Sequence, residues 1–155
     1  MDKISNMHSL YFIEESSIEE IYSSHTLEYY DQHEVIGVLL ELKRVLRPGG
    51  KLFVTVPDFR SLLSIYELTN SINSIRGPLF GRWPNNSSFI YHKTCWDKSS
   101  LTDVLEQTGF TSIKEFSPIT YLTKIDSSYD DYSLAFYPHK DINGIQVSLA
   151  LTAVK

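Results

Sequence analysis

Two histidines stand at positions where the sequence pattern permits chemistry. His25 follows the serines Ser23 and Ser24 at the end of a short β-type run, and His92 follows Tyr91 in a segment rich in aromatic residues. An imidazole titrates near neutral pH and can take a proton from a nucleophile. Both histidines are therefore candidates for a catalytic base. The alternative for His25 is that it ties the turn after its strand through a backbone hydrogen bond.

Two predicted strands end near His25 and would position it. The first covers Ile18–Ser24, a short run of β-compatible side chains. The second, Lys51–Pro57, is an almost continuous apolar run, which is typical of a strand buried on both faces of a parallel sheet. Because ligands of open α/β sheets bind beyond the carboxyl ends of such strands, we expect Pro57 to face the same ligand as His25.

Three helices are predicted, because apolar residues recur at helical spacing after residues that can cap a helix. The capping positions are Asp31, Asp58, and either Asp97 or Ser99. The first helix is expected to end at Pro48-Gly49-Gly50 and the third at Gly109, since glycine readily takes the backbone conformation of a helix C-terminus.

Two further strands are predicted near the C-terminus, over Thr111–Ser117 and Ile145–Val154. No strong helix pattern separates them, so we expect them to be antiparallel neighbours. Asn143-Gly144 supplies the turn before the last strand.

The segment of about residues 70–94 is predicted to be an irregular loop with many aromatic side chains. Long loops of this kind are uncommon unless they serve a function. The loop is either packed on the domain by its own rings or a lid that faces a substrate. In the second case Trp83, Tyr91 and His92 contact the substrate together with Pro57.

Composition excludes several classes of protein. The chain has 155 residues, 42% of them hydrophobic, and a net charge of −5, which predicts one globular domain over residues 1–155. The acidic balance argues against nucleic acid as a partner. No apolar run reaches the ~18 residues that a membrane span needs, and no signal peptide is visible, so we expect a cytoplasmic protein.

The sequence predicts no metal site. Cys95 is the single cysteine, so an internal disulfide and a cysteine-based zinc site are excluded. Its thiol is expected to be packed. The acidic residues Asp126, Asp130 and Asp131 lack the glycine and terminal glutamate of a calcium loop. They are interpreted as a solvated surface.

Several stretches of the chain resemble class I S-adenosylmethionine-dependent methyltransferases. Ser17–Glu28 resembles the family's fourth strand, and Leu39–Asp58, with Arg47-Pro48-Gly49-Gly50 before its apolar run, resembles the following helix, turn and fifth strand. Tyr91–Thr94 and Leu101–Phe110 resemble the later helix that ends in Gly-Phe. More narrowly, the chain is similar to small methyltransferases linked to polysaccharide and sugar metabolism.

The resemblance implies an α/β fold with a partial Rossmann-like sheet, in which parallel strands precede a C-terminal antiparallel pair. It implies methyl transfer from S-adenosylmethionine to a small-molecule acceptor. It places Asn6 and Met7 at the adenine of the cofactor, and Ser23, Ser24 and His25 along the cofactor cleft. A capping or turn role is the alternative for Asn6.

The chain departs from the family at the cofactor loop. The family begins with a strand, a G-x-G loop and a second strand ending in an acidic residue, whereas here no G-x-G occurs and the first glycine is Gly37. Glycine lets the backbone approach a ligand, and a carboxylate binds ribose hydroxyls. The sequence therefore resembles the C-terminal part of the fold, lacking its first three strands. We expect weak or no cofactor binding by this chain alone.

The departure also predicts an interaction. Without the first three strands, Ile18–Ser24 becomes an edge whose unpaired N–H and C=O groups seek a partner. We expect a homo-oligomer, or a separate chain that supplies the missing half. Three readings stay open: a methyltransferase, a non-catalytic interaction or assembly module, and a truncated gene product.

Overall fold

The computed structural model describes residues 7–85, 87–125 and 131–155, and a four-stranded sheet forms the centre of this part of the chain. Its strand order is β1-β2-β8-β5. β1 runs parallel to β2, and β8 runs antiparallel to both β2 and β5. The predicted α/β fold with an antiparallel C-terminal pair is confirmed. The strands are β1 Ile18–Ser24, β2 Leu46–Pro57, β5 Thr111–Glu115 and β8 Ser148–Val154.

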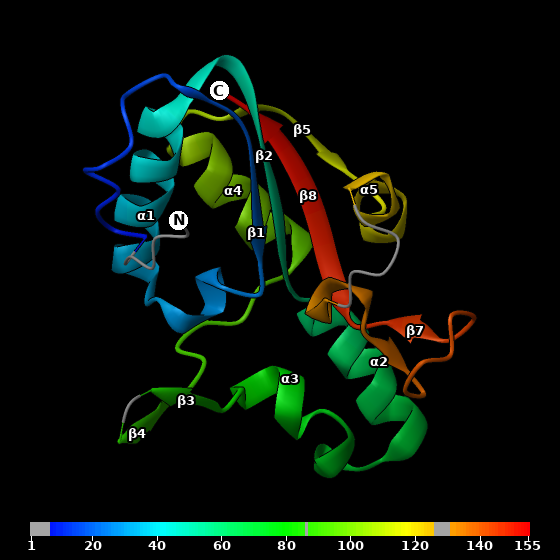
Figure 1. Cartoon of the computed structure of the whole chain (residues 1–155). Coiled ribbons are helices and arrows are strands. Elements are labelled where there is room, and N and C mark those ends of the chain that lie inside the picture. Colours follow the sequence, from blue (N-terminus) through cyan, green and yellow to red (C-terminus); the bar gives the residue numbers. More distant parts are fainter. Residues whose placement is uncertain (1–6, 86, 126–130) are drawn as a thin grey trace.

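Helices cover both faces of the sheet. α1 (Gln32–Val45) and α4 (Lys98–Gln107) lie on one face, and α5 (Pro118–Ile125) lies on the other (Figure 1). Asp31 opens α1 in a capping box with Glu34, as predicted. Asp97, and not Ser99, caps α4.

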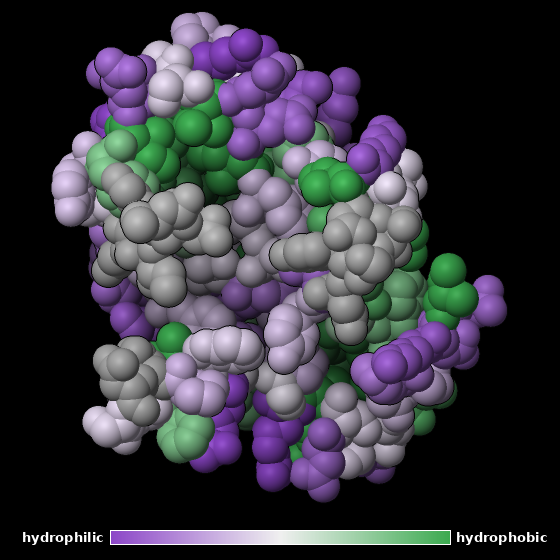
Figure 2. Space-filling view, viewed as in Figure 1, coloured by the Kyte–Doolittle hydropathy of each residue, from purple (hydrophilic) through white to green (hydrophobic). Residues whose placement is uncertain are grey.

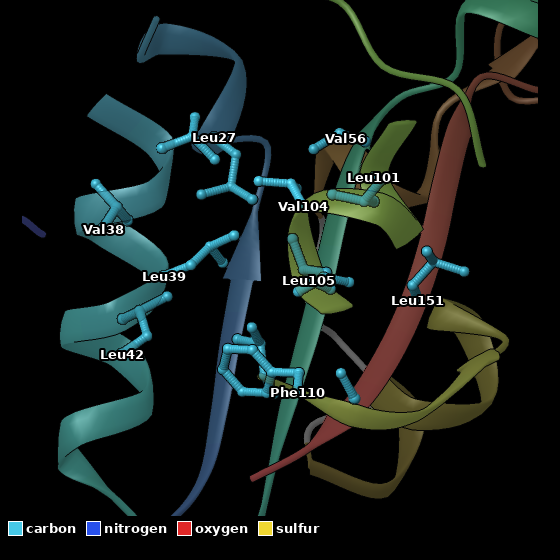
Figure 3. Close-up of a cluster of buried hydrophobic side chains, with 14 of the residues drawn as sticks. Leu27, Val38, Leu39, Leu42, Val56, Leu101, Val104, Leu105, Phe110 and Leu151 are labelled. Carbon is cyan, nitrogen blue, oxygen red and sulfur yellow. The ribbon is translucent and has the colours of Figure 1, made fainter. Parts of the chain in front are cut away.

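Side-chain alternation along β2 explains why both faces are covered. Leu52, Val54 and Val56 point toward α1 and α4 and are fully buried. The opposite face carries Phe53, whose ring stacks on that of Tyr121 from α5 at 4.2 Å between centroids. The first of these layers is the main hydrophobic core, to which α1 and α4 contribute mostly leucines and valines (Figure 3).

The remaining elements gather beyond the ends at which β1 and β2 terminate (Figure 1). The predicted irregular segment is more ordered than expected, because it contains a 3-10 turn, a short helix and a hairpin. α2 packs there through Leu62 and Ile65 in a second, smaller core cluster. These elements are α2 Phe59–Thr69, η2 Ile72–Ser74, α3 Arg76–Phe80, β3 Trp83–Asn85, β4 Ser88–Ile90, β6 Phe136–Tyr137 and β7 Ile145–Gln146.

Two predicted strand boundaries are wrong for tertiary reasons. β2 begins at Leu46 and not at Lys51, because Leu46 pairs with Ile18 across a register shift in β1. The predicted last strand is divided, since Ile145–Gln146 leaves the main sheet and forms a hairpin with Phe136–Tyr137. Helix α5 was not predicted at all.

None of the helices in the described ranges combines the length and the apolar character that crossing a membrane requires.

Candidate functional site

A cavity of about 1360 Å³ opens at the carboxyl end of β1. Its walls come from segments far apart in the sequence: the turn after β1, α3, the β3–β4 hairpin, and η3 (Tyr132–Leu134) with β6. This is the position at which open α/β sheets bind their ligands. The structure brings together five of the predicted site residues on its walls, namely Ser24, His25, Trp83, Tyr91 and His92.

Three other predicted site residues lie elsewhere. Ser23 is buried below the cavity, and its hydroxyl has no hydrogen-bond partner among the described residues. Pro57 is buried in the sheet opposite Ser148 and is not one of the described residues that line the cavity. Met7 packs against the main core. Asn6 lies outside the described residues.

His25 is held in a strained conformation at the end of β1. Its φ of 46° lies in the left-handed region, which a non-glycine residue occupies at an energetic cost. Its amide donates to the carbonyl of Thr55 at 2.9 Å, and its Nε2 lies 2.7 Å from Oγ of Ser148. Backbone and ring are thus both fixed, which combines the turn-tying role with a place on the cavity wall. Burial lowers the pKa of His25 to about 4, so its ring is neutral at pH 7.

His92 reaches the same place from the opposite wall. Its amide donates to the carbonyl of Phe80 at 2.8 Å, and its Nδ1 lies 3.1 Å from the carbonyl of Pro78. Its ring lies nearly perpendicular to that of Tyr29, with 4.8 Å between the ring centroids. Burial lowers the pKa of His92 below its ordinary value, so this ring is also neutral near pH 7.

Glu28 lies between the two histidines. Its Oε1 is 3.6 Å from Nδ1 of His25 and 3.8 Å from Nε2 of His92, and its side chain is 1% exposed. Neither carboxyl oxygen has a hydrogen-bond partner among the described residues. Burial raises the pKa of Glu28 to about 8. Glu28 was not predicted to be a site residue, although its spacing of three residues from His25 is the signal that could have found it.

Asp131 corrects the prediction of a solvated acidic surface. Its carboxylate accepts hydrogen bonds from the hydroxyl of Ser24 at 2.5 Å, from the amide of Ser133 at 2.8 Å, and from Tyr22 at 3.3 Å. Burial acts to raise the pKa of Asp131, but these hydrogen bonds outweigh it and hold that pKa below its ordinary value. Asp126 and Asp130 lie outside the described residues.

Aromatic rings make up much of the cavity wall. Tyr29, Trp83, Tyr91 and Tyr132 all line it, and Trp83 and Tyr91 are about half exposed. Such rings bind apolar and cationic ligands. Figure 2 shows one face of the molecule, on which polar residues dominate the periphery and apolar surface is visible between them.

The described residues include no group of three histidine, cysteine or acidic side chains arranged to hold a metal ion. Cys95 is exposed, which corrects the prediction of a packed thiol.

Comparisons of the sequence and of the fold with known proteins both find methyltransferases. Residues 3–54 match the family described as methyltransferase domain. No curated protein sequence matches the chain. The fold is that of class I S-adenosylmethionine-dependent methyltransferases, which confirms the resemblance to this class seen in the sequence.

Three similar solved structures illustrate the likeness. A SAM-dependent methyltransferase from Archaeoglobus fulgidus has a TM-score of 0.55 at 14% identity, and 97% of this chain covers 66% of that one. A possible histamine N-methyltransferase from Thermotoga maritima has a TM-score of 0.55 at 18% identity, with coverage of 97% and 62%. A Burkholderia thailandensis N-methyltransferase with bound S-adenosylhomocysteine has a TM-score of 0.52 at 12% identity, with coverage of 97% and 48%. The chain thus spans less than two thirds of the length of these proteins.

Proposed function

We propose that this chain takes part in S-adenosylmethionine-dependent methyl transfer to a small molecule bound in the cavity at the end of β1. The observation that carries the proposal is the cavity itself, which lies at the ligand-binding edge of a methyltransferase fold and is lined by His25 and His92. Its volume of about 1360 Å³ exceeds the ~300–1,000 Å³ typical of a site for one small molecule. It therefore has room for an acceptor beside the reacting end of a donor.

The side chains that line the cavity suit the positively charged sulfur of the cofactor. S-adenosylmethionine supplies an electrophilic methyl group on a positively charged sulfur. Aromatic faces such as those of Tyr29 and Tyr132 attract a cation, and the carboxylate of Asp131 adds negative charge to the same wall. The described residues that line this cavity include no G-x-G loop to hold the methionine end of the cofactor.

The contacts to the methionine end of the cofactor, which this cavity wall lacks, could come from a partner. β1 has β2 as its one neighbouring strand among the described residues, and an edge strand of this kind can pair with a further strand. We propose that a second copy or a separate polypeptide pairs with this edge, and that a separate polypeptide would bring the glycine loop. Sedimentation velocity over a wide concentration range tests this. A monomer at every concentration would argue against a second copy as the partner.

Methyl transfer is an in-line displacement that depends mainly on positioning. A base is needed only when the nucleophile carries a proton. His25 and His92 are neutral near pH 7 and can serve in this role. The acceptor is proposed to be a small molecule, and its link to polysaccharide or sugar metabolism remains a prediction, as does the cytoplasmic location.

Calorimetric titration with S-adenosylhomocysteine, at a measured oligomeric state, tests the proposed function. Saturable binding that His25→Gln weakens about tenfold, or about 1.4 kcal/mol, supports it. His33→Gln, at an exposed position of α1, is the matched control and should leave the affinity unchanged. If high ligand produces no heat and no thermal stabilisation, in the chain alone and in its complex with any polypeptide that pairs with β1, the result favours the alternative, a non-catalytic interaction module with a methyltransferase fold.

A further inference from the structure

The hydrogen-bond partners of the two cavity histidines fix their tautomers. Oγ of Ser148 donates its proton to the carbonyl of Tyr132 at 3.1 Å, so it accepts from Nε2–H of His25. The carbonyl of Pro78 can only accept, so His92 carries its proton on Nδ1. In a neutral ring the other nitrogen is an acceptor. Those two nitrogens are Nδ1 of His25 and Nε2 of His92.

Both acceptor nitrogens face the same carboxyl group. They lie 3.6 Å and 3.8 Å from Oε1 of Glu28, whose carboxyl group has no hydrogen-bond partner in any other described residue. The one other donor near it in the described chain is its own backbone N–H, whose lowering effect on the pKa is smaller than the raising effect of burial. An ionised Glu28 would present its negative charge to two lone pairs with no donor between them. A protonated Glu28 supplies the one donor that this arrangement lacks. The raised pKa of Glu28 and the lowered pKa values of both histidines agree with that assignment.

We propose that Glu28, His25 and His92 share a single proton in the resting protein. Once this proton has left, Glu28 is a positioning residue whose carboxylate makes the histidines competent to accept the proton of the methyl acceptor. This inference rests on the proposed function and extends it to the class of acceptor. A base of this kind suits a nucleophile that carries a proton, such as a hydroxyl or a primary or secondary amine. A thioether or a tertiary amine has no proton to lose and needs no base.

The proton balance follows from the chemistry of displacement. The acceptor heteroatom forms a bond to the methyl carbon while the carbon–sulfur bond breaks, and that electron pair stays on sulfur. The proton of the acceptor passes to Nε2 of His92 or Nδ1 of His25, opposite the Glu28 carboxylate. The resulting imidazolium is paired with Glu28 until the proton leaves to solvent. The competent form therefore has Glu28 ionised and both rings neutral.

A few other titratable or charged groups among the described residues lie around Glu28, His25 and His92. Tyr29 lies beside Glu28 and His92, and Asp131 acts on His25 to raise its pKa. Arg76 and Arg82 line the same cavity from α3 and the segment after it. The ammonium of Lys93 turns away and pairs with Glu34 at 2.8 Å.

Imidazole NMR titration tests the shared proton without any methyl transfer. In wild-type protein, in buffer with EDTA, resonances of His25 and His92 should move together with a midpoint near pH 8, the pKa of Glu28. Glu28→Gln should abolish this step, while Glu67→Gln, at an exposed position of α2, should preserve it. Absence of the step from wild type, or its survival in Glu28→Gln, would overturn the proposal. Single histidine-to-glutamine variants assign the resonances.

The pH profile of methyl transfer tests the consequence for the reaction. With a hydroxyl or primary amine acceptor, the wild-type rate should rise through pH 8, and Glu28→Gln should lower it at least about tenfold and remove the rise. With a tertiary amine acceptor the two proteins should differ little. An equal loss with both acceptors would contradict the role in proton transfer. If the chain shows the titration step but binds no S-adenosylhomocysteine, either alone or with a polypeptide that pairs with β1, the proposed function fails. If it binds the ligand but shows no step, this inference fails alone.

Discussion

The amide of Lys93 donates a hydrogen bond to the carbonyl of Glu28 at 2.8 Å, and the amide of Thr94 donates to the same oxygen at 3.2 Å. This backbone link joins the segment after the β3–β4 hairpin to the turn after β1. It explains how His92 comes to lie beside a carboxyl group so distant in the sequence. The backbone of Glu28 thus anchors the segment whose histidine its side chain faces.

Stability should depend on pH through Glu28. The folded-state pKa of about 8 exceeds the ordinary 4.5, so folding stabilises the protonated form, and this contribution is lost as pH rises through 8. The lowered pKa values of His25 and His92 change stability only below about pH 6.5. Between pH 6.5 and 8 the free energy of unfolding should fall by on the order of 2 kcal/mol, at about 1.4 kcal/mol per pH unit.

Urea denaturation at several pH values measures this fall. Glu28→Gln removes the titrating group and should flatten the profile above pH 6.5, whereas Glu67→Gln should keep the wild-type slope. A slope in Glu28→Gln equal to that of wild type would assign the pH dependence to another group.

Gly81 should be intolerant of a side chain, because His92 occupies the space beside it. A Cβ at Gly81 would overlap the His92 ring, and the φ of 55° is strained for any other residue. Gly81→Ala should therefore destabilise the fold by about 1–3 kcal/mol and displace the ring from Glu28. Gly77→Ala is the matched control, since no described atom lies within 4 Å of its Cβ. Thermal unfolding and the His92 resonance measure both effects; an unmoved resonance in Gly81→Ala would contradict the packing.

Asp131 should stabilise the cavity wall. Its Oδ1 accepts from Ser24, Tyr22 and the amide of Ser133, and Asp131→Asn keeps this oxygen but removes the negative charge that strengthens the three hydrogen bonds. We expect a loss of about 1–3 kcal/mol in unfolding free energy. The exposed Asp103 of α4 provides the control Asp103→Asn, with a change within about 0.5 kcal/mol. Similar values for the two variants would show that the network adds no net stability.

The core between the sheet and its helices should be sensitive to truncation. Leu105 of α4 is fully buried in the main cluster, so Leu105→Ala should cost about 2–5 kcal/mol. Leu68→Ala, at a position that is 69% exposed on α2, should change stability by less than about 1 kcal/mol. Urea denaturation separates the two, and a small loss for Leu105→Ala would mean that α4 is loosely packed.

The sequence by itself determined three of the helices, the approximate positions of the four main strands and the antiparallel pairing of the last two. The apolar run before Pro57 could only be a strand buried on both faces, and Asp31 with Glu34 defined the start of α1. These features depend on neighbours within a few residues, which the chain order supplies. The five predicted residues that meet on the cavity wall followed from their places at strand and loop ends.

Tertiary structure alone decided the electrostatics of the site. In the sequence Glu28 stands close to the start of a predicted helix, where a glutamate caps or pairs. Only the folded chain brings His92 from another segment to its side chain and buries the carboxyl group without a hydrogen-bond partner in any other described residue. Asp131 likewise became a hydrogen-bond acceptor for Ser24 only when its loop met the end of β1. Burial and pairing between distant segments set a pKa, and neither is encoded in local spacing.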